Sequence, residues 1–334
     1  MTKRDEQPLI GESPAFLGVL EEISRAAPLD RPVLIVGERG TGKEMIADRL
    51  HFLSARWDQP LVRMNCAAIS EGLLESELFG HEAGAFTDAS RARKGRFELA
   101  DGGSLFLDEL ATTAMNVQEK ILRVIEYGQF ERLGSSRSLE VDVRLIGATN
   151  EDLPTLAEKG HFRADLLDRL AFDVITLPPL RARREDIMPL AEHFAMRMSR
   201  DLGRELFAGF TTSARERLLN HAWPGNVRQL KNVIERAVYR HEDPAEPVSQ
   251  LQFDPFESDW RPASASTAPA QARSGADSLP DNLREHLDAI EKNLVEQALQ
   301  QSGGHQGMAA ERLGLSYDQL RGILRKHGIG KQSR

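Results

Sequence analysis

The first half of the chain, from about Ile10 to Val174, alternates short apolar runs with helical patterns. A strand buried on both faces of a sheet reads as a nearly continuous aliphatic run, whereas apolar residues every three or four positions indicate a helix. Aliphatic runs separated by helical stretches are the rhythm of a parallel α/β sheet. The predicted strands are residues 33–36, 61–65, 104–109, 143–150 and 172–177.

Beyond Pro178 and Pro179 the pattern becomes helical, with helices predicted near 184–201, 211–221 and 226–241. Residues 261–278 then lack aromatic residues and any apolar side chain larger than alanine, so they bury too little surface to offset the entropy of ordering. Helical periodicity returns at residue 283. The expected parts are an α/β body at 8–178, a helical lid at 179–243, a flexible linker at 244–280 and a helical module at 281–334.

Composition and charge narrow the class of protein. Of the 334 residues, 28 % are charged, and neither a membrane-spanning run nor the apolar core of a signal peptide is found, so we expect a cytoplasmic protein without membrane insertion. Cys66 is the only cysteine, which excludes an internal disulfide and CxxC-type metal sites. The net charge is −8, yet residues 302–334 hold six basic residues against two acidic ones. A basic tail on an acidic body is typical of an attached DNA-contacting module.

The first predicted strand runs into a glycine-rich loop that ends on a lysine, RPVLIVGERGTGK at residues 31–43. Such a loop closes backbone N–H groups around phosphate oxygens, at the positive end of a helix that we expect to begin near Glu44. The usual motif places Ser or Thr, a Mg²⁺ ligand, where Glu44 stands, so the metal must be held elsewhere. The alternative is a plain turn between strand and helix. The candidate nucleotide-binding residues here are Gly37, Glu38, Arg39, Gly40, Thr41, Gly42, Lys43 and Glu44.

Three further predicted strands end in polar residues. We expect Asp108 to hold Mg²⁺ and Glu109 to polarise the attacking water, because the carboxyl ends of parallel strands meet at one crevice. The alternative is that both acids cap a helix. Asn65 and the pair Thr149–Asn150 are candidates to sense the γ-phosphate, although an Asn at a strand end is more often a turn residue.

Arg163 and Arg169 lie six positions apart on one predicted helix, and therefore on different faces. One of them is a candidate arginine finger that reaches a phosphate across a subunit boundary, while the other serves the interface. The alternative, which the spacing by itself favours, is surface pairing with Asp165 and Asp168.

Five blocks resemble the sigma-54-dependent enhancer-binding activators of bacteria, a branch of the AAA+ ATPases: GERGTGKE, SELFGHEAGAFTDA, GGSLFLDEL, FRADLLDRL and WPGNVRQLKN, over roughly Leu9 to His241. The resemblance implies an AAA+ P-loop NTPase with a parallel sheet and a helical lid that needs ATP and Mg²⁺. It also implies a homo-oligomeric ring, expected to be a hexamer, that binds enhancer DNA and remodels closed complexes of sigma-54 RNA polymerase. Family members carry Glu at the position of Glu44.

The resemblance further implies roles for single residues. Asn65 is implied to act as a switch paired with Glu109. The other implied roles are phosphate binding by Lys43, metal and water binding by Asp108 and Glu109, sensor I at Thr149 and Asn150, fingers acting across the subunit boundary at Arg163 and Arg169, and sensor II at Arg228.

The sigma-factor loop of the family reads GAFTGA, and here it is Gly84, Ala85, Phe86, Thr87, Asp88 and Ala89. The resemblance implies that Phe86 and Thr87 touch the sigma factor as the nucleotide state raises and lowers the loop. Asp88 replaces the second glycine, which adds a charge and removes permissive backbone angles. Our hypothesis is that ATPase activity survives while coupling to the sigma factor weakens. The alternative, favoured by the residues alone, is a surface turn whose Phe86 folds back into the core.

Residues 305–327 read as a helix, a short turn at Gly314 and a second helix with Leu320, Ile323 and Leu324 on its buried face, which is a helix-turn-helix pattern. The alternative is a solvated basic helix at a terminus. The tail resembles Fis-type modules, all-α DNA-binding domains, and the apolar face of the preceding helix would pack a dimer through Leu287, Ile290, Leu294 and Leu299. The candidate DNA contacts are Gln319, Arg321, Arg325 and Lys326.

The phosphate loop begins within the first forty residues, so no receiver or ligand-sensing domain precedes it, and we expect an inhibitory protein to act in trans. Trp57 is a candidate anchor for it, unless the side chain is buried as most tryptophans are. Two other functions remain open. An AAA+ unfoldase or chaperone would share the ATPase residues but not need a DNA-binding tail, and the intact Lys43, Asp108 and Glu109 argue against a DNA-binding repressor without productive ATPase activity.

Overall fold

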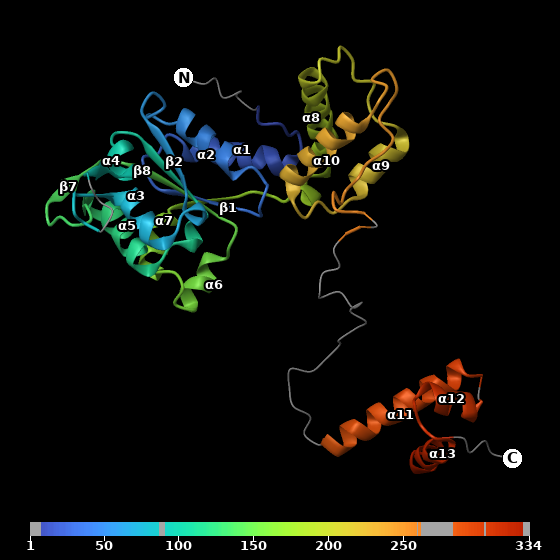
Figure 1. The fold of residues 1–334 in the computed structure, drawn as a ribbon. Coiled ribbons are helices and arrows are strands. Elements are labelled where there is room, and N and C mark those ends of the chain that lie inside the picture. The colour runs from blue at the N-terminus through green and yellow to red at the C-terminus, as the bar shows by residue number, and fades with distance from the viewer. Residues whose placement is uncertain (1–7, 87–90, 259, 262–282, 304, 330–334) are drawn as a thin grey trace. The chain divides into compact units, whose positions relative to one another are not determined.

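The computed structural model describes residues 8–86, 91–258, 260–261, 283–303 and 305–329. The chain forms two compact units, Met1–Glu257 and Ser258–Arg334 (Figure 1). The first contains an α/β body and a helical lid, and the described part of the second contains three helices. Each unit is described by itself.

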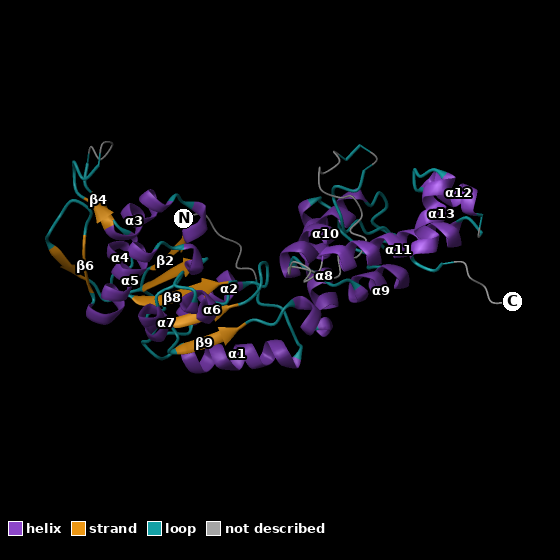
Figure 2. Cartoon of the chain, turned by 90° about the horizontal axis from the view of Figure 1, so that it is seen from below, coloured by secondary structure: helices purple, strands orange, loops and turns teal. Residues whose placement is uncertain are grey.

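The α/β body is built on a five-stranded parallel sheet with strand order β2-β5-β8-β1-β9. All five predicted strands are confirmed, and their carboxyl ends share one edge because the strands are parallel (Figure 2). The strands are β1 (Val33–Val36), β2 (Leu61–Asn65), β5 (Ser104–Asp108), β8 (Arg144–Thr149) and β9 (Asp173–Thr176).

Helices cover both faces of this sheet (Figure 2). Side chains alternate along a strand, so Leu34 packs into the cluster that includes α5 and α7, whereas Val33 and Ile35 pack into the cluster that includes α1 and α2. Both faces of the sheet are therefore buried from solvent, as is usual for a parallel sheet. These helices are α1 (Pro14–Ala26), α2 (Lys43–Phe52), α5 (Met115–Tyr127), α6 (Leu153–Glu158) and α7 (Ala164–Leu170).

An insertion between β2 and β5 carries the loop with Phe86. Its base is fixed by an aromatic cluster of Phe79, Phe97 and Phe130, whose ring centroids lie 5.4 to 6.0 Å apart. A second hairpin supplies Phe130. The insertion comprises α3 (Glu71–Phe79), β3 (Gly80–His81), β4 (Arg93–Lys94) and α4 (Arg96–Leu99), and the hairpin comprises β6 (Gln129–Glu131) and β7 (Ser138–Glu140).

The lid is helical, as predicted, and packs around the fully buried Trp223. Val248 and Leu251 also belong to its core. The packed lid therefore continues past residue 243, whereas the sequence predicts that the linker begins at residue 244. The reason is that the side chains of Val248 and Leu251 are buried against the lid helices. Its helices are α8 (Ile187–Asp201), α9 (Thr212–Asn220) and α10 (Asn226–Arg240), and short 3₁₀ turns at Leu180–Ala182 and Arg184–Asp186 precede them.

The second unit has the predicted helix-turn-helix. Leu320 and Leu324 are buried against Val295 of the preceding helix, and Gly314 makes the turn with a φ angle of 65°. Among the described residues we find no helix with the length and apolarity needed to cross a membrane. The helices are α11 (Leu283–Gln301), α12 (Gln306–Arg312) and α13 (Tyr317–Lys326).

Candidate functional site

The phosphate loop lies between β1 and α2, and glycines set its course. Gly40 and Gly42 have φ angles of 78° and 106°, at which any other residue would be strained. Gly42 caps α2, whose first residue is Lys43, one position before the expected start. The loop therefore leads directly into the positive end of a helix, the arrangement that binds phosphate.

Lys43 is buried, and its ammonium group donates to the carbonyl oxygens of Gly37 at 2.9 Å and Glu38 at 3.4 Å. Burial lowers the pKa of Lys43, while the carboxylates of Glu109 and Asp108 oppose that shift by stabilising the charged form. A phosphate would offer this cation stronger, charge-assisted hydrogen bonds than neutral carbonyls do. Lys43 is thus placed to bind an anion in the pocket it lines.

Asp108 ends β5, next to the end of β2, and Glu109 follows it. Because β2 and β5 pair with Asn65 opposite Asp108, the amide of Asn65 donates to the Asp108 carboxylate at 3.2 Å. The expected pair of Asn65 with Glu109 is not among the described contacts. Glu109 lies one residue past the paired strands, in a left-handed conformation with φ 53°, and its carboxylate is 3.8 Å from the Arg39 guanidinium. The strand register therefore gives Asn65 a different partner from the implied one.

The end of β8 brings Thr149 and Asn150 to the same edge. The carbonyl of Thr149 accepts from the N–H of Gly37 at 3.1 Å, and its hydroxyl accepts from the N–H of Glu151 at 2.9 Å. Thr149 is therefore engaged in joining the strand end to the phosphate loop. In contrast, the side-chain oxygen of Asn150 is buried and has no hydrogen-bond partner among the described residues. An unpaired buried acceptor beside the phosphate loop is open to a ligand or a water.

The phosphate loop, the end of β5 and the lid line a pocket of about 300 Å³, and its lining does not include Asn65, Thr149 or Asn150. Arg228, from the first turn of α10, is among its lining residues, and the backbone N–H of Arg228 donates to the Gly40 carbonyl at 3.3 Å. A nucleotide joins a charged triphosphate to a flat, largely apolar base, and the lining offers both kinds of surface. The apolar lining includes Leu9, Ile10, Phe16, Leu190 and Phe194, and the charged lining includes Lys43, Asp108, Glu109, Arg228 and Lys231.

The donor set also fits a magnesium ion that accompanies the phosphates. Mg²⁺ prefers carboxylate oxygens and keeps several waters, and Asp108 supplies such an oxygen in the pocket of Lys43. Glu44 lines the same pocket and is exposed. Asp108 is therefore the candidate metal ligand.

Arg163 and Arg169 stand at the two ends of α7, and neither lines the nucleotide pocket of its own chain. Arg163 donates to Asp165 at 2.7 and 3.0 Å, which agrees with the surface-pair alternative. Arg169 instead donates to Glu126 on α5 at 2.9 Å. Both arginines are thus held by acids of the same chain.

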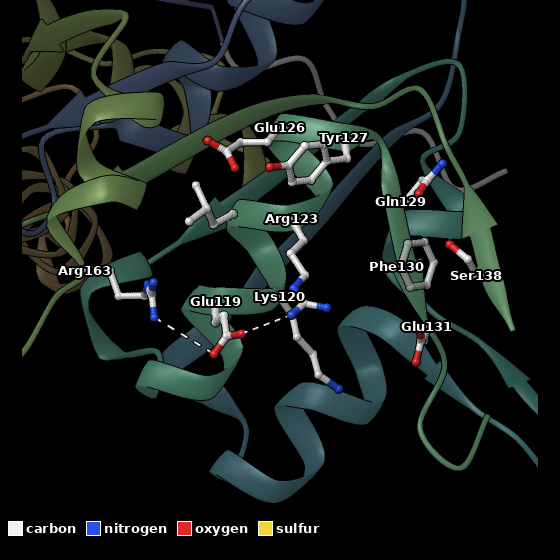
Figure 3. A pocket seen from close by; sticks show the side chains of 11 residues that line it. Glu119, Lys120, Arg123, Glu126, Tyr127, Gln129, Phe130, Glu131, Ser138 and Arg163 are labelled. Carbon is white, nitrogen blue, oxygen red and sulfur yellow. Dashed lines mark hydrogen bonds and ion pairs between the residues drawn. The ribbon is translucent and has the colours of Figure 1, made fainter. Parts of the chain in front are cut away.

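A second pocket, of about 540 Å³, lies between α5 and the β6–β7 hairpin, and Arg163 is part of its lining. Figure 3 shows Arg163 directed towards Glu119, with a distance of 4.0 Å between their charged groups, and Glu119 also bonded to Arg123. Acids and bases alternate over this surface, so it carries no single sign of charge.

The loop with Phe86 is firmly held at its base. Arg132 donates to Glu82 at 2.8 Å and to both carboxylate oxygens of Glu98, at 2.6 and 2.9 Å. The ring of Phe86 is 40 % exposed and packs edge-on against His81 at 4.9 Å. The alternative of a Phe folded into the core is therefore met only in part, since the ring leans on the surface of the insertion. The expected partner contacts Thr87, Asp88 and Ala89 lie outside the described residues.

The basic residues of α13 divide into two groups. Arg321 and Arg325 are exposed and lie four positions apart, on one face. Lys326 donates to Asp288 at 2.6 Å and to Glu291 at 2.8 Å, so it is held by α11. The side chain of Gln319 accepts from the N–H of Ser316 at 2.8 Å and closes the start of α13, a capping role that the sequence analysis did not assign.

The four apolar residues expected to form one face of α11 fall into two groups, exposed and packed. Leu287, Ile290 and Leu294 are exposed, with exposed fractions of 44 to 54 %. Leu299 instead packs against the core of its own unit. The first three remain candidates for packing against a second copy.

Sequence reasoning missed lid residues that touch the phosphate loop. Arg183 is 2 % exposed, stacks over Phe16 at 4.9 Å and donates to the Thr41 carbonyl at 3.1 Å. Arg181 and Asn226 contact Glu38. A usable signal was present, because LRARRED places arginines directly where the chain enters the lid and PGN places an asparagine at a helix start.

Comparison with protein families assigns most of the chain. Residues 9–176 match the sigma-54 interaction domain, residues 181–272 match the AAA+ ATPase lid domain, and residues 286–327 match bacterial regulatory proteins of the Fis family. The three matches agree with the body, the lid and the helix-turn-helix described above.

Individual proteins that are similar to this chain agree with the family matches. The chain is 58 % identical over 321 residues to the Psp operon transcriptional activator of Escherichia coli (strain K12), with 96 % of this chain and 98 % of that protein covered. It is 46 % identical over 308 residues to the transcriptional regulatory protein ZraR of Klebsiella oxytoca, covering 92 % of this chain and 66 % of that one. The solved structure of NtrX from Brucella abortus in complex with ATP matches with a TM-score of 0.66 at 33 % identity, over 97 % of this chain and 70 % of that chain.

Matches to both a sigma-54 interaction domain and a Fis-family domain favour an activator over the unfoldase and repressor alternatives. The nucleotide pocket and the helix-turn-helix provide the two structural parts that such an activator needs. The chain belongs to the sigma-54-dependent transcriptional activators, with an AAA+ domain and a Fis-family DNA-binding domain.

Proposed function

We propose that this chain hydrolyses ATP and uses the energy to remodel closed complexes of sigma-54 RNA polymerase at a phage shock (membrane stress) operon. The observation that carries the proposal is that Lys43, Asp108 and Glu109 share one pocket with the lid residue Arg228. The identity of 58 % to a Psp operon activator supports the choice of operon.

Lys43 and Arg228 would bind the phosphates. Lys43 exchanges its bonds to the Gly37 and Glu38 carbonyls for bonds to the β- and γ-phosphates, and Arg228 approaches from the lid. Mg²⁺ held by Asp108 would neutralise phosphate charge. The ATP complex of the similar protein NtrX supports ATP as the nucleotide.

Glu109 is the candidate general base. A water adds to the γ-phosphorus, the bond from that phosphorus to the bridging oxygen breaks, and a proton of the water passes to the Glu109 carboxylate. Glu109 now faces Arg39 at 3.8 Å, so it must turn away from that exposed arginine to meet the water. The unpaired oxygen of Asn150 is a candidate to orient the water.

A second subunit would complete the site. Arg163 and Arg169 lie outside the pocket of their own chain, and leaving their pairs with Asp165 and Glu126 costs little, because exposed ion pairs contribute little to stability. A ring, which we expect to be a hexamer, would bring one of these arginines to the phosphates of its neighbour. An arginine finger contributes about 10³- to 10⁵-fold in rate.

A short stretch of chain would carry the nucleotide state to the sigma-factor loop. From Asn65 it runs through a 3₁₀ turn at Cys66–Ala68 and through α3 to His81, against which Phe86 rests. The side chain of Asn65 accepts from the N–H of Ala67 at 3.0 Å, so a change at Asn65 acts directly on the start of this stretch. Phe86 and Thr87 would then contact the sigma factor.

The C-terminal unit would hold the ring at enhancer DNA, with exposed Arg321 and Arg325 as the main contacts. We propose a cytoplasmic location, because the DNA and the polymerase on which the protein would act are found there. An inhibitory protein acting in trans would dock on the apolar surface at the end of α2, where Trp57 is 63 % exposed and Phe52 is 60 % exposed.

Transcription in vitro from a sigma-54 promoter tests the proposal. We expect transcript with ATP and none with a non-hydrolysable analogue, because cleavage supplies the energy. A protein truncated before Leu279 should still act, but only at higher concentration, since it no longer gathers on the enhancer. Equal transcript with the analogue, or purified protein that does not cleave ATP, would overturn the proposal.

A further inference from the structure

Glu38 belongs to the phosphate loop, yet its carboxylate turns to the lid. Arg181 donates to both carboxylate oxygens, at 2.8 Å and 2.5 Å, and the amide of Asn226 donates to one of them at 3.0 Å. These three bonds cross from the body to the lid. They hold the pKa of Glu38 at about 2, with the hydrogen bonds from Arg181 as the largest cause.

The contact between Glu38 and the lid includes a buried residue, Asn226, as well as the exposed Arg181. Asn226 is fully buried, and its φ angle of 49° is strained for a residue other than glycine. Its amide also donates to the Arg39 carbonyl at 3.1 Å, and its side-chain oxygen accepts from the N–H of Leu180 at 2.8 Å. One asparagine thus joins the phosphate loop to both the entrance of the lid and the start of α10.

The backbones meet closely at the same place. A Cβ atom on Gly40 would lie 2.4 Å from the Gly225 carbonyl oxygen, so only glycine fits against the turn that precedes α10. Arg228 follows two residues after Asn226, in the first turn of that helix. The position of Arg228 over the nucleotide pocket therefore depends on how this turn sits on the phosphate loop.

The backbone carbonyl of Glu38 points to the phosphate loop and not to the lid, because it accepts from the hydroxyl of Thr41 and from the ammonium group of Lys43. One residue of the loop consequently contacts both the phosphate-binding lysine and the lid. We propose that Glu38 is a positioning residue for nucleotide binding: paired with Arg181 and Asn226, it latches the lid to the phosphate loop and so holds Arg228 where the phosphates bind.

This inference rests on the proposed function only in taking ATP as the substrate. The latch acts on binding, because it sets the lid, whereas the candidate groups for cleavage, Asp108 and Glu109, belong to the body. Loosening the latch should therefore weaken nucleotide binding and leave the rate of cleavage at saturation nearly unchanged.

The test compares E38Q, R181Q and the double variant in the full-length chain. Gln retains the shape of Glu38 and can still accept from Asn226, but it loses the charged pair with Arg181. We expect each single variant to raise the KM for ATP and the dissociation rate of a fluorescent ADP by about 3- to 5-fold, with kcat within about twofold. The double variant should resemble the single ones, since one interaction is removed in all three.

R184Q is the matched control. Arg184 is an exposed arginine in the same segment, but it donates to Asn220 within the lid at 3.2 Å and does not reach Glu38. It should bind nucleotide as the unchanged protein does. Thermal melting of each variant without nucleotide should shift little, because the pair of Glu38 and Arg181 is exposed by 42 and 49 %.

Unchanged KM and ADP dissociation in E38Q and R181Q would overturn the latch. So would a loss in kcat at unchanged KM, since that would place Glu38 in the chemical step, or effects that add in the double variant. Absence of ATP cleavage by the unchanged protein would instead contradict the proposed function, and fluorescent ADP would still report on the latch.

Discussion

The phosphate loop and the loop that carries Phe86 are both glycine-containing turns that follow a strand, yet the molecule holds them differently. The first is covered by the body and the lid, and its lysine is 8 % exposed. The described part of the second is held at its base by Arg132, while the ring of Phe86 is 40 % exposed and packs on His81. Fixed geometry is thus found where the proposed function would position phosphates, and an exposed apolar ring where it would contact a partner.

The two loops differ in how their contacts would transmit a change. The phosphate loop is hydrogen-bonded to Lys43 and to the lid, so a small displacement of the loop would move these neighbouring groups as well. The contact of Phe86 with His81 involves two rings and is easily exchanged for a contact with another protein. Changes at the first loop should therefore alter nucleotide binding or cleavage, and changes at the second should alter only coupling.

The largest effect is expected for the arginines that would complete the phosphate site from a neighbour. Replacement by alanine of whichever arginine acts as the finger, Arg163 or Arg169, should lower ATP turnover by about 10³- to 10⁵-fold. Steady-state turnover at a protein concentration that supports assembly is the measurement. Mixing that variant with K43A should restore part of the activity, because a mixed interface pairs an intact finger with an intact phosphate loop. Full turnover in both arginine variants would show instead that the site is complete within one chain.

Loss of Glu109 should be the next largest effect. E109A should lower turnover by about 10²- to 10⁴-fold, the usual contribution of a general base, with nucleotide affinity retained because Lys43 and the loop are intact. Titration with fluorescent ATP alongside turnover separates the two. E151Q, which changes an exposed acid after the neighbouring strand β8, should have little effect on either. Turnover unaffected in E109A would remove Glu109 from the mechanism.

Phe86 should separate coupling from catalysis. F86A should reduce promoter opening by more than about tenfold while ATP turnover stays within about twofold, because Phe86 lies outside the pocket lining. Opening is measured on a sigma-54 promoter in the presence of ATP. F256A removes another exposed phenylalanine, 70 % exposed, and should leave opening unchanged. Equal opening in F86A and the unchanged protein would contradict the assignment.

Asp88 offers a gain in the same assay. D88G restores the glycine that the family loop carries and should raise promoter opening per ATP cleaved by a few-fold, since backbone freedom returns and a charge is lost. The ratio of opened promoter to phosphate released is the relevant quantity. Absence of any gain would remove the hypothesis that Asp88 weakens coupling.

The smallest expected effect concerns pH. The pKa of Glu38 is lowered from its ordinary value of 4.5 to about 2, so its bonds to the lid stabilise the fold fully above about pH 4.5, and this contribution is lost as the pH falls towards 2. The contribution is at most about 1 kcal/mol, because the pair is exposed to water. Urea midpoints of E38Q and the unchanged protein should differ slightly from pH 8 to 5 and converge below pH 4.5. A difference that grows with acidity would contradict this sign.

Much of the body could be predicted from the sequence, because the signals are local. Aliphatic runs predicted all five strands, and the glycines predicted the turn before Lys43. The partners of single side chains could not be predicted, since they depend on register and on distant segments. Asn65 lies opposite Asp108 because of how β2 and β5 align, and Arg169 meets Glu126 of another helix.

In the lid, too, the helices can be predicted from the sequence but the side-chain contacts cannot. The helices were predicted from periodicity, whereas the contacts of Arg181, Arg183 and Asn226 with the phosphate loop join positions more than 140 residues apart. Val248 and Leu251 belong to the lid core, but the sequence predicts a linker there because two apolar residues in a polar segment carry little periodicity. Such features follow from packing and not from the local pattern.

A photo-crosslinking residue in place of Phe86 tests most directly whether ATP cleavage at the phosphate loop moves the sigma-factor loop. Crosslinks to the sigma factor would be measured without nucleotide, with ADP and with ATP, and again in a chain that also carries E109A. We expect strong crosslinking during turnover and weak crosslinking without nucleotide, with ADP or after loss of Glu109. Equal crosslinking in every state would contradict this expectation.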